Sequence, residues 1–204
     1  MLKIAGYHWP DDVGGSWEHS LRHVKSLDYA ISICKQRRVA VQAGGNMGLW
    51  PLRMSDSFEQ VHTFEPHAGA RECLTANIEG KSNIVLHPNA LGDRPSKVQM
   101  LTKGLGSHCV AQEKREDKAW VDVVTIDGLG LSNVDLIQLD VEGYEWHALL
   151  GGWETVKRWR PVIQMEFRGF TKKYGQSDDN IDSMLTDIGY KLVSRQPGSD
   201  VVYA

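Results

Sequence analysis

Residues 38–48 constrain the fold of this chain more than any other segment. Their sequence is Arg-Val-Ala-Val-Gln-Ala-Gly-Gly-Asn-Met-Gly, so a β-branched, apolar run ends on two glycines and a helix-forming segment follows at once. Glycines at such a turn let the backbone bend sharply and let a ligand approach the main chain. The pattern therefore predicts a strand, a tight turn and a helix, with a binding site at the turn.

A second short strand follows about twenty residues later and ends on an acidic residue, Glu65, just before Pro66. In a parallel sheet this carboxylate lies beside the glycine turn, where it can accept hydrogen bonds from both hydroxyls of a ribose. The alternative is a charge that only stabilises the start of the next helix. The position after a glycine turn favours the ribose interpretation, and the chain looks built to hold a nucleoside.

Strand and helix patterns alternate along the rest of the chain. We expect strands at residues 39–43, 62–65, 83–87, 134–140 and 162–167, helices at 47–57, 68–79, 144–158 and 179–188, and a closing hairpin of 190–194 with 201–203. This α/β order predicts a mixed, mostly parallel sheet with helices on both faces and an antiparallel edge strand. Ligands bind such sheets at the carboxyl ends of the strands, so Glu65, Asp140 and Glu166 should converge there.

Two segments lie outside this alternation. Residues 1–37 form an N-terminal arm and helix, which we expect to act as a lid over the binding site or to lie on its substrate side, and residues 38–204 form the main domain. Within that domain, residues 96–126 form an insertion whose antiparallel pieces we place at 98–101, 109–112 and 121–125.

Residues 136–145 are the second informative block, with the sequence Leu-Ile-Gln-Leu-Asp-Val-Glu-Gly-Tyr-Glu. A buried strand brings Asp140 and Glu142 to the mouth of the sheet, and carboxylates this close cost stability unless they have partners. Glu142 and Glu145 could also be simple charges in the first turn of a helix. Asp140 is harder to explain in that way because it ends an almost wholly apolar strand.

Together these blocks resemble the FkbM family of S-adenosylmethionine-dependent methyltransferases. The resemblance is carried by Val-Gln-Ala-Gly-Gly-Asn-Met-Gly at 41–48, Phe-Glu-Pro at 64–66, Asn-Ala-Leu-Gly-Asp at 89–93, Val-Thr-Ile-Asp at 124–127, and Leu-Asp-Val-Glu-Gly-Tyr-Glu at 139–145 with Leu-Gly at 150–151. It covers about residues 38–168. It implies a Rossmann-like fold with a seven-stranded sheet, S-adenosylmethionine as cofactor, and methyl transfer that is usually directed to oxygen.

The resemblance also implies roles for individual residues. Those expected to bind the cofactor are Gly44, Asn46 and Gly48 at its methionine part, Glu65 with Pro66 at the ribose, Ala90 and Leu91 beside the adenine, and Asp140 near the methyl group, which Glu142 should also face. Gln42 belongs to this set but departs from the family, which usually has Asp there. Gln keeps an acceptor oxygen and loses the charge, so its attraction to the cofactor's ammonium group should be weaker.

A hydroxyl acceptor must lose its proton, and a carboxylate or imidazole within hydrogen-bond reach would take it. The catalytic candidates are Asp140, Glu142 and Glu166. His147 is a further candidate but is more typical of a helix surface. His19 and His23 are spaced to share a metal ion, yet no third ligand is evident, so we expect two exposed helical histidines and no metal site.

Composition narrows the alternatives. The formal charge of −3 gives no electrostatic reason to expect nucleic acid or an anionic membrane as partner. With the methyltransferase activity that the resemblance implies, we expect a small-molecule or glycan acceptor. Cys34, Cys73 and Cys109 form no CxxC pair and suggest a reducing cytoplasm. Two other functions stay open: a nicotinamide-dependent oxidoreductase, which shares the strand–glycine–helix start, and a non-catalytic relative, which Gln42 favours.

Overall fold

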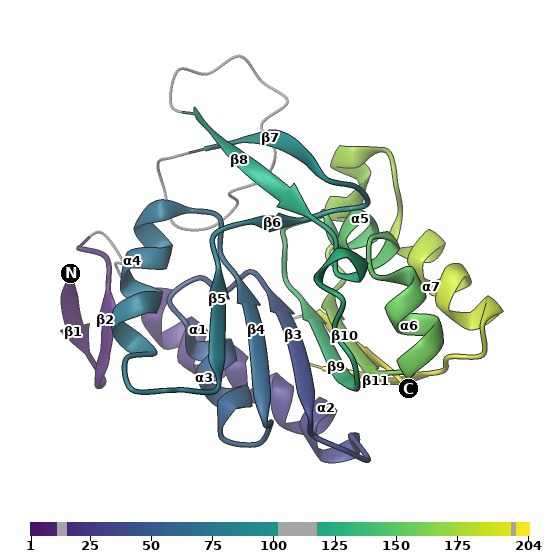
Figure 1. Ribbon diagram of the computed structural model, residues 1–204, viewed down its shortest axis with the longest axis horizontal. Coiled ribbons are helices and arrows are strands. Elements are labelled where there is room, and N and C mark those ends of the chain that lie inside the picture. Colours follow the sequence, from purple (N-terminus) through teal and green to yellow (C-terminus); the bar gives the residue numbers. More distant parts are fainter. Residues whose placement is uncertain (12–15, 102–117, 197–198) are drawn as a thin grey trace.

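The computed structural model describes residues 1–11, 16–101, 118–196 and 199–204. Its centre is a seven-stranded sheet (Figure 1). In spatial order the strands are β11 (Leu192–Arg195), β12 (Asp200–Tyr203), β10 (Val162–Glu166), β9 (Val134–Leu139), β3 (Val39–Ala43), β4 (Gln60–Phe64) and β5 (Ile84–His87). The expected piece at 109–112 and Cys109 lie outside the described residues.

The sheet is mixed and mostly parallel, as the alternation of strands and helices predicts. Strands β10, β9, β3, β4 and β5 pair in parallel, while β12 pairs antiparallel with both β10 and the outermost strand β11. The order reverses at β3, because β4 follows on one side of it and β9 lies on the other. Ligands bind such sheets in the crevice at this reversal.

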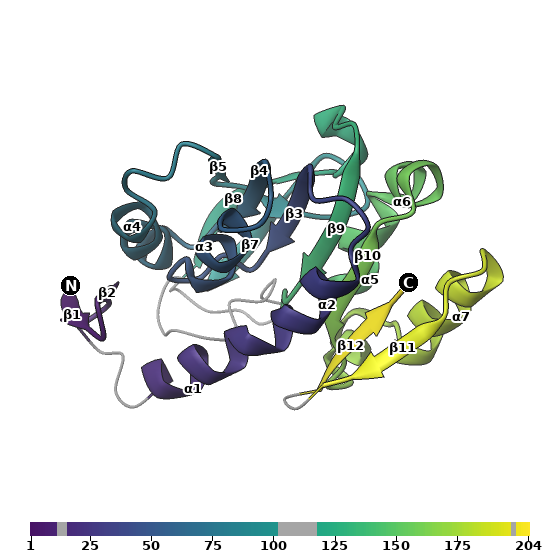
Figure 2. The same ribbon diagram turned by 90° about the horizontal axis from the view of Figure 1, so that it is seen from below.

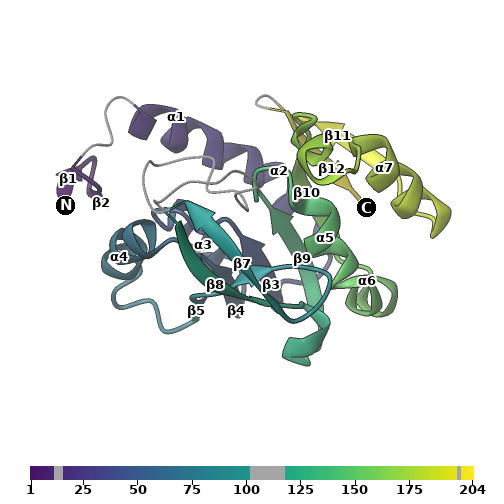
Figure 3. The ribbon, with the colours of Figure 1, turned by 90° about the horizontal axis from the view of Figure 1, so that it is seen from above.

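Helices cover both faces of the sheet. They are α1 (Ser16–His23), α2 (Leu27–Ile33), α3 (Leu49–Ser55), α4 (Ala68–Asn77), α5 (Glu145–Leu150), α6 (Trp153–Trp159) and α7 (Asp178–Asp187), with 3-10 turns η1 (Val24–Ser26), η2 (Asp127–Leu129) and η3 (Phe170–Tyr174). Successive strand residues face opposite sides, so Ala40 packs with α2 and α3, whereas Val41 packs with α5, α6 and α7. Figures 2 and 3 show α1 and α2 running along one side.

The helix expected at 144–158 is in fact two helices, which is a correction to the sequence interpretation. The break falls at Gly151 and Gly152, between α5 and α6. A Cβ atom on Gly151 would lie 1.9 Å from the carbonyl oxygen of Gly92, so this main chain needs glycine for close approach. Asp127 then caps α6 from a distance, because its carboxylate accepts the main-chain N–H groups of Glu154 and Thr155.

Together with the short strand before it, the insertion forms a small sheet, which lies beyond the ends of the main strands in Figure 1. Its strands are β6 (Ala90–Leu91), β8 (Lys118–Val124) and β7 (Ser96–Leu101), in that order. β7 and β8 pair antiparallel and β6 pairs in parallel with β8.

The N-terminal arm is anchored to the main domain. A hairpin of β1 (Leu2–Ile4) and β2 (Tyr7–Trp9) places Trp9 fully inside, against Met47, Leu49 and Cys73. The side chain of Asn77 in α4 also donates hydrogen bonds to the carbonyl oxygens of His8 and Met47. Trp17 and Leu21 of α1 pack against the same cluster, which places α1 beside the turn after β3.

Candidate active site

Because side chains alternate along a strand, the register of the sheet shows which predicted site residues share a face. Thr63, Gln42, Gln138 and Gln164 are in register across β4, β3, β9 and β10. Two residues further along each strand come Glu65, Gly44, Asp140 and Glu166, which therefore lie on the same face. Because Gly44 stands between Glu65 and Asp140, the acidic residues divide into two groups. The expectation that all three converge is therefore wrong: only Asp140 and Glu166 meet.

The turn after β3 requires glycine for two reasons. Gly44 has a φ of +84°, in the left-handed region that L side chains rarely adopt. A Cβ atom there would also lie 1.9 Å from the main-chain oxygen of Asp140. The N–H groups of Gly44 and Gly45 both donate to the Phe64 carbonyl, which ties the turn to the end of β4.

Glu65 reaches directly to this turn. Its Oε2 accepts the main-chain N–H of Asn46 at 2.7 Å, and its Oε1 accepts that of His67 at 2.8 Å. The residue is only 6% exposed. Burial raises the pKa of Glu65 to about 7, although these two N–H groups and Arg71 oppose the rise. Partners that donate to the carboxylate would therefore stabilise its charged form.

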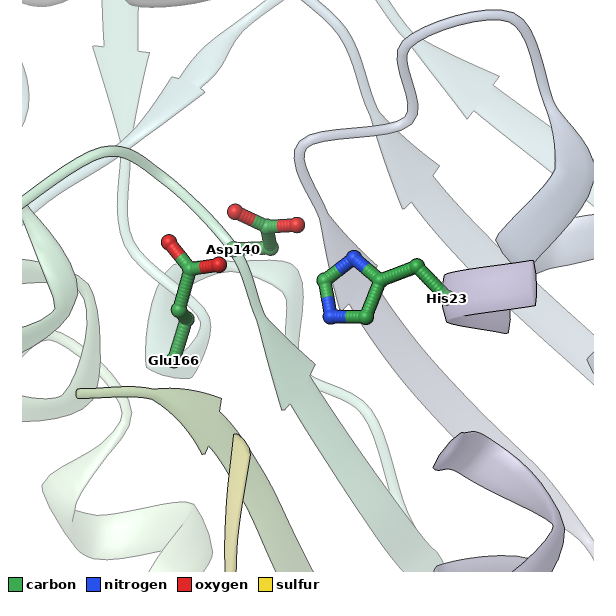
Figure 4. A group of neighbouring side chains, drawn as sticks. All are labelled: His23, Asp140 and Glu166. Atoms are coloured by element: carbon green, nitrogen blue, oxygen red, sulfur yellow. The ribbon is translucent and has the colours of Figure 1, made fainter. Parts of the chain in front are cut away.

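A pocket of about 160 Å³ opens between α1 and the carboxyl ends of β3, β9 and β10. This volume is well above the roughly 15 Å³ that a single water molecule needs. The polar residues in its lining include His23, Asn46, Asp140, Glu142, Glu166 and Arg168. Figure 4 shows the imidazole of His23 and the carboxylates of Asp140 and Glu166 pointing toward one another.

The two carboxylates of this cluster have raised pKa values. Burial and the nearby charge of Glu142 raise the pKa of Asp140 to about 6. Burial and the charge of Asp140 raise the pKa of Glu166 to about 8, while Arg168, at 3.0 Å from its carboxylate, opposes the rise. No hydrogen bond or ion pair reaches the Asp140 carboxylate from the described residues. Burial and mutual repulsion thus disfavour the charged forms of both carboxylates.

His23 belongs to this site, which corrects the expectation of an exposed helical histidine. Its side chain is 10% exposed, and its Nε2 lies 3.0 Å from Oδ2 of the buried Asp200. The hydrogen bond to Asp200 raises the pKa of His23, against burial, which lowers it. Asp200 also accepts hydrogen bonds from Ser26 and Gln164.

Sequence reasoning missed Asp200, although one signal was present. Asp200 directly precedes the apolar residues of the final strand, and antiparallel pairing sets it opposite Glu166. Only the register of β12 on β10 reveals that opposition, and the sequence does not specify this register.

Gln42 is fully buried in β3, two residues before Gly44 of the turn. Its Oε1 accepts the hydroxyl of Thr63 at 2.5 Å, and its Nε2 has no hydrogen-bond partner among the residues that the structure describes. Its contact with a cofactor stays a prediction.

The other predicted site residues lie around the turn or away from the pocket. Gly48 has a φ of +93° and precedes α3, so that this helix starts at Leu49 and not at Met47 as expected. Ala90 and Leu91 form β6, and Pro66 follows Glu65; none of these three lines the pocket. His147 is half-buried, stacks on Tyr144 and lies outside the pocket.

Comparison with known proteins identifies the family. The model of the methyltransferase FkbM domain matches residues 44–192, well over half of the chain. The chain therefore belongs to the FkbM methyltransferase family. The matched range contains Gly44, Glu65, Asp140 and Glu166, and leaves out His23 and Asp200. No curated protein matches the sequence.

Solved structures share the fold at low sequence identity. Methyltransferase FkbM from Methylobacillus flagellatus KT has a TM-score of 0.54 and 17% identity, over 82% of this chain and 43% of its own. The chain thus spans less than half of that protein. SMU.1697c, a putative methyltransferase from Streptococcus mutans in complex with SAH, has a TM-score of 0.55 and 12% identity, over 87% and 93%. Precorrin 8w decarboxylase from Methanobacterium thermoautotrophicum has a TM-score of 0.54 and 12% identity, over 100% and 96%.

Proposed function

We propose that this chain is an S-adenosylmethionine-dependent methyltransferase that methylates a hydroxyl oxygen of a sugar or another small metabolite. One observation carries the proposal: the Glu65 carboxylate lies 2.7 Å from the main-chain nitrogen of Asn46, at the glycine turn of an FkbM-family chain. A ribose held by Glu65 would place the rest of the cofactor over this turn, next to the acidic pocket.

The residues at the turn suit such a cofactor. Each Glu65 oxygen accepts one main-chain N–H and keeps capacity for a ribose hydroxyl. The side-chain Oδ1 of Asn46 is buried without a partner among the described residues and can accept from the ammonium group of the methionine part. Ala90 and Leu91 stay the proposed neighbours of the adenine.

The cofactor supplies an electrophilic methyl group on a sulfonium. In the transfer, the bond from carbon to sulfur breaks while a bond from carbon to the acceptor oxygen forms, and a neutral thioether leaves. The protein must hold these three atoms in line, which alone can lower the barrier by several kcal/mol. The hydroxyl proton passes to a carboxylate of the pocket, where Asp140, Glu142 and Glu166 are the candidates.

The charge of the pocket supports a small-molecule or glycan acceptor. Among the described residues, three carboxylates and one guanidinium line it, so a polyanion such as nucleic acid would be repelled at this opening. In the described part of the chain we find no helix with the length and apolar character that a membrane span requires.

The proposal is tested by incubating the protein with methyl-labelled S-adenosylmethionine and a panel of sugars and other hydroxyl compounds. Mass spectrometry should detect a product heavier by one methyl group, together with S-adenosylhomocysteine. Thermal-shift measurements with NAD(H) and with S-adenosylhomocysteine address the oxidoreductase alternative. Stabilisation by NAD(H) alone would overturn the proposal.

A further inference from the structure

Three potential metal ligands from distant parts of the chain meet in the pocket. His23 ends α1, Asp140 follows β9 and Glu166 ends β10. Each offers a ligand atom, and these atoms all lie within 4.8 Å of one another (Figure 4). We propose that His23, Asp140 and Glu166 form a binding site for one divalent cation.

The charge balance of the pocket favours a cation. Asp140, Glu142 and Glu166 line it, and Asp200 is hydrogen-bonded to His23, whereas Arg168 is the one guanidinium that the described residues contribute to the lining. Arg168 pairs with Glu166 and leaves the Asp140 carboxylate without a hydrogen bond or ion pair from the described residues. Carboxylates in such a place are costly unless a positive charge compensates them.

The hydrogen bond behind His23 is the arrangement that metal-binding histidines use. Asp200 is 1% exposed, and its Oδ2 lies 3.0 Å from Nε2 of the imidazole. With Nε2–H donating to Asp200, the lone pair of the neutral ring is on Nδ1. Such a carboxylate fixes both the tautomer and the orientation of a ligating ring. Ser26 and Gln164 in turn hold Asp200, so the imidazole is oriented before any ion arrives.

The spacing of the ligands is close to what an ion needs. Donors about 2.1 Å from one ion lie at most about 4.2 Å apart, and the three ligand atoms already lie within 4.8 Å of one another, so small side-chain movements would bring them within reach of one ion. One imidazole and two carboxylates suit Mn²⁺, Fe²⁺ or Zn²⁺ better than Ca²⁺. Three protein ligands also leave coordination positions open toward the pocket.

The consequence for catalysis rests on the proposed function. A cation at this site would lower the pKa of a hydroxyl placed beside it. Because Asp140 and Glu166 would hold the cation, Glu142 is the carboxylate of the lining that would take the proton. The open positions suit an acceptor with two neighbouring oxygen atoms, such as a vicinal diol.

Titration with Mn²⁺ alone, followed by calorimetry and electron paramagnetic resonance, tests the site without any methyl transfer. We expect one ion per chain. The Asp140→Asn and His23→Asn variants should each weaken its affinity at least ~10-fold, and Asp200→Asn should weaken it roughly 10–100-fold by releasing the ring. Asp140→Asn removes a buried charge, so thermal unfolding should show that this variant still folds.

His19→Asn separates this site from the histidine pair that the sequence suggests. His19 lies one turn before His23 and lines the same pocket, but it is not among the three ligands. We expect its Mn²⁺ affinity to stay within about twofold of the unmodified protein, in contrast to the ligand variants. Equal losses for His19→Asn and His23→Asn would overturn the proposal, as would Mn²⁺ affinity that none of the ligand variants changes.

A parallel titration with S-adenosylhomocysteine in the presence of EDTA distinguishes this inference from the proposed function. Binding of S-adenosylhomocysteine without any binding of Mn²⁺ would refute only the cation site. Binding of Mn²⁺ without S-adenosylhomocysteine would refute the methyltransferase proposal and leave the cation site standing.

Discussion

Asp200 holds the imidazole of His23 at 3.0 Å, although 177 positions separate the two residues. The contact joins the end of α1 in the N-terminal arm to the last strand of the sheet. Both residues lie outside the range that matches the family model. The two ends of the chain therefore contribute to a pocket whose carboxylates Asp140 and Glu166 lie within the matched range.

Gly44→Ala should destabilise the protein strongly, and Gly80→Ala provides a matched control. Both glycines have positive φ, +84° and +82°, but a Cβ on Gly80 meets nothing within 4 Å. The control should lose about 1–2 kcal/mol of unfolding free energy from backbone strain alone. Gly44→Ala adds the collision with Asp140 and should lose more than about 4 kcal/mol.

Denaturant unfolding of the two glycine variants measures this difference. Equal losses would mean that the chain relaxes around the new methyl group, and that the close approach of the turn to Asp140 does not limit this position.

Glu65→Gln should weaken binding of S-adenosylhomocysteine and remove its dependence on pH. With a pKa of about 7, Glu65 is mostly charged at pH 8 and mostly protonated at pH 6. A ribose that donates to the carboxylate should therefore bind about tenfold more tightly at pH 8. The variant should bind roughly 10–100-fold more weakly than the unmodified protein at pH 8.

Calorimetry at the two pH values checks this expectation. An unmodified protein with the same affinity at both, or a Gln variant with full affinity, would remove the ribose role of Glu65.

Gln42→Asp introduces the residue that the family resemblance implies at this position. A charge in this fully buried place should lower the melting temperature of the free protein, because the sheet provides little solvation. If Gln42 lies near the cofactor's ammonium group, the variant should bind S-adenosylhomocysteine more tightly, by about tenfold.

Gln138→Asp is the control for this variant. Gln138 is equally buried and in register with Gln42 on the next strand, but it lies under Asp140 and away from Glu65. It should show the loss of stability without the gain in affinity. A Gln42→Asp protein that folds but binds no better than before would instead favour a non-catalytic relative.

Glu145→Gln should change how stability depends on pH. Glu145 is 2% exposed, and its Oε1 accepts the N–H groups of Val141 and Gly143, a role that Gln can keep. Burial raises its pKa from 4.5 to about 7 in the folded state. The folded protein thus binds more protons than the unfolded chain between these values, and its unfolding free energy falls as pH rises through them.

The Glu145→Gln variant lacks this titration, so its stability relative to the unmodified protein should rise between pH 4.5 and 8. The difference should be on the order of 3 kcal/mol at most. Urea unfolding across this range measures it, and a difference that does not change with pH would contradict the raised pKa.

The sequence was sufficient for the framework because the framework is local. The alternation of strand and helix patterns and the glycines at 44–48 predicted the parallel strands and the turn. The acidic residues at the ends of three strands gave Glu65, Asp140 and Glu166. The split of α5 from α6 was missed because it depends on Gly92 and Asp127, which are distant in sequence.

The histidine site was missed for the same physical reason. Whether His23 faces solvent or the pocket depends on how α1 docks, and on the register that brings Asp200 beside Glu166. A helical spacing of histidines contains neither kind of information.

A crystal structure with S-adenosylhomocysteine bound tests the central claim most directly. The account predicts both ribose hydroxyls within about 2.6–3.2 Å of the Glu65 carboxylate, with the sulfur over the turn at Gly44 and facing Asp140. A ligand seated elsewhere, with Glu65 still bonded only to the main chain of Asn46 and His67, would contradict it.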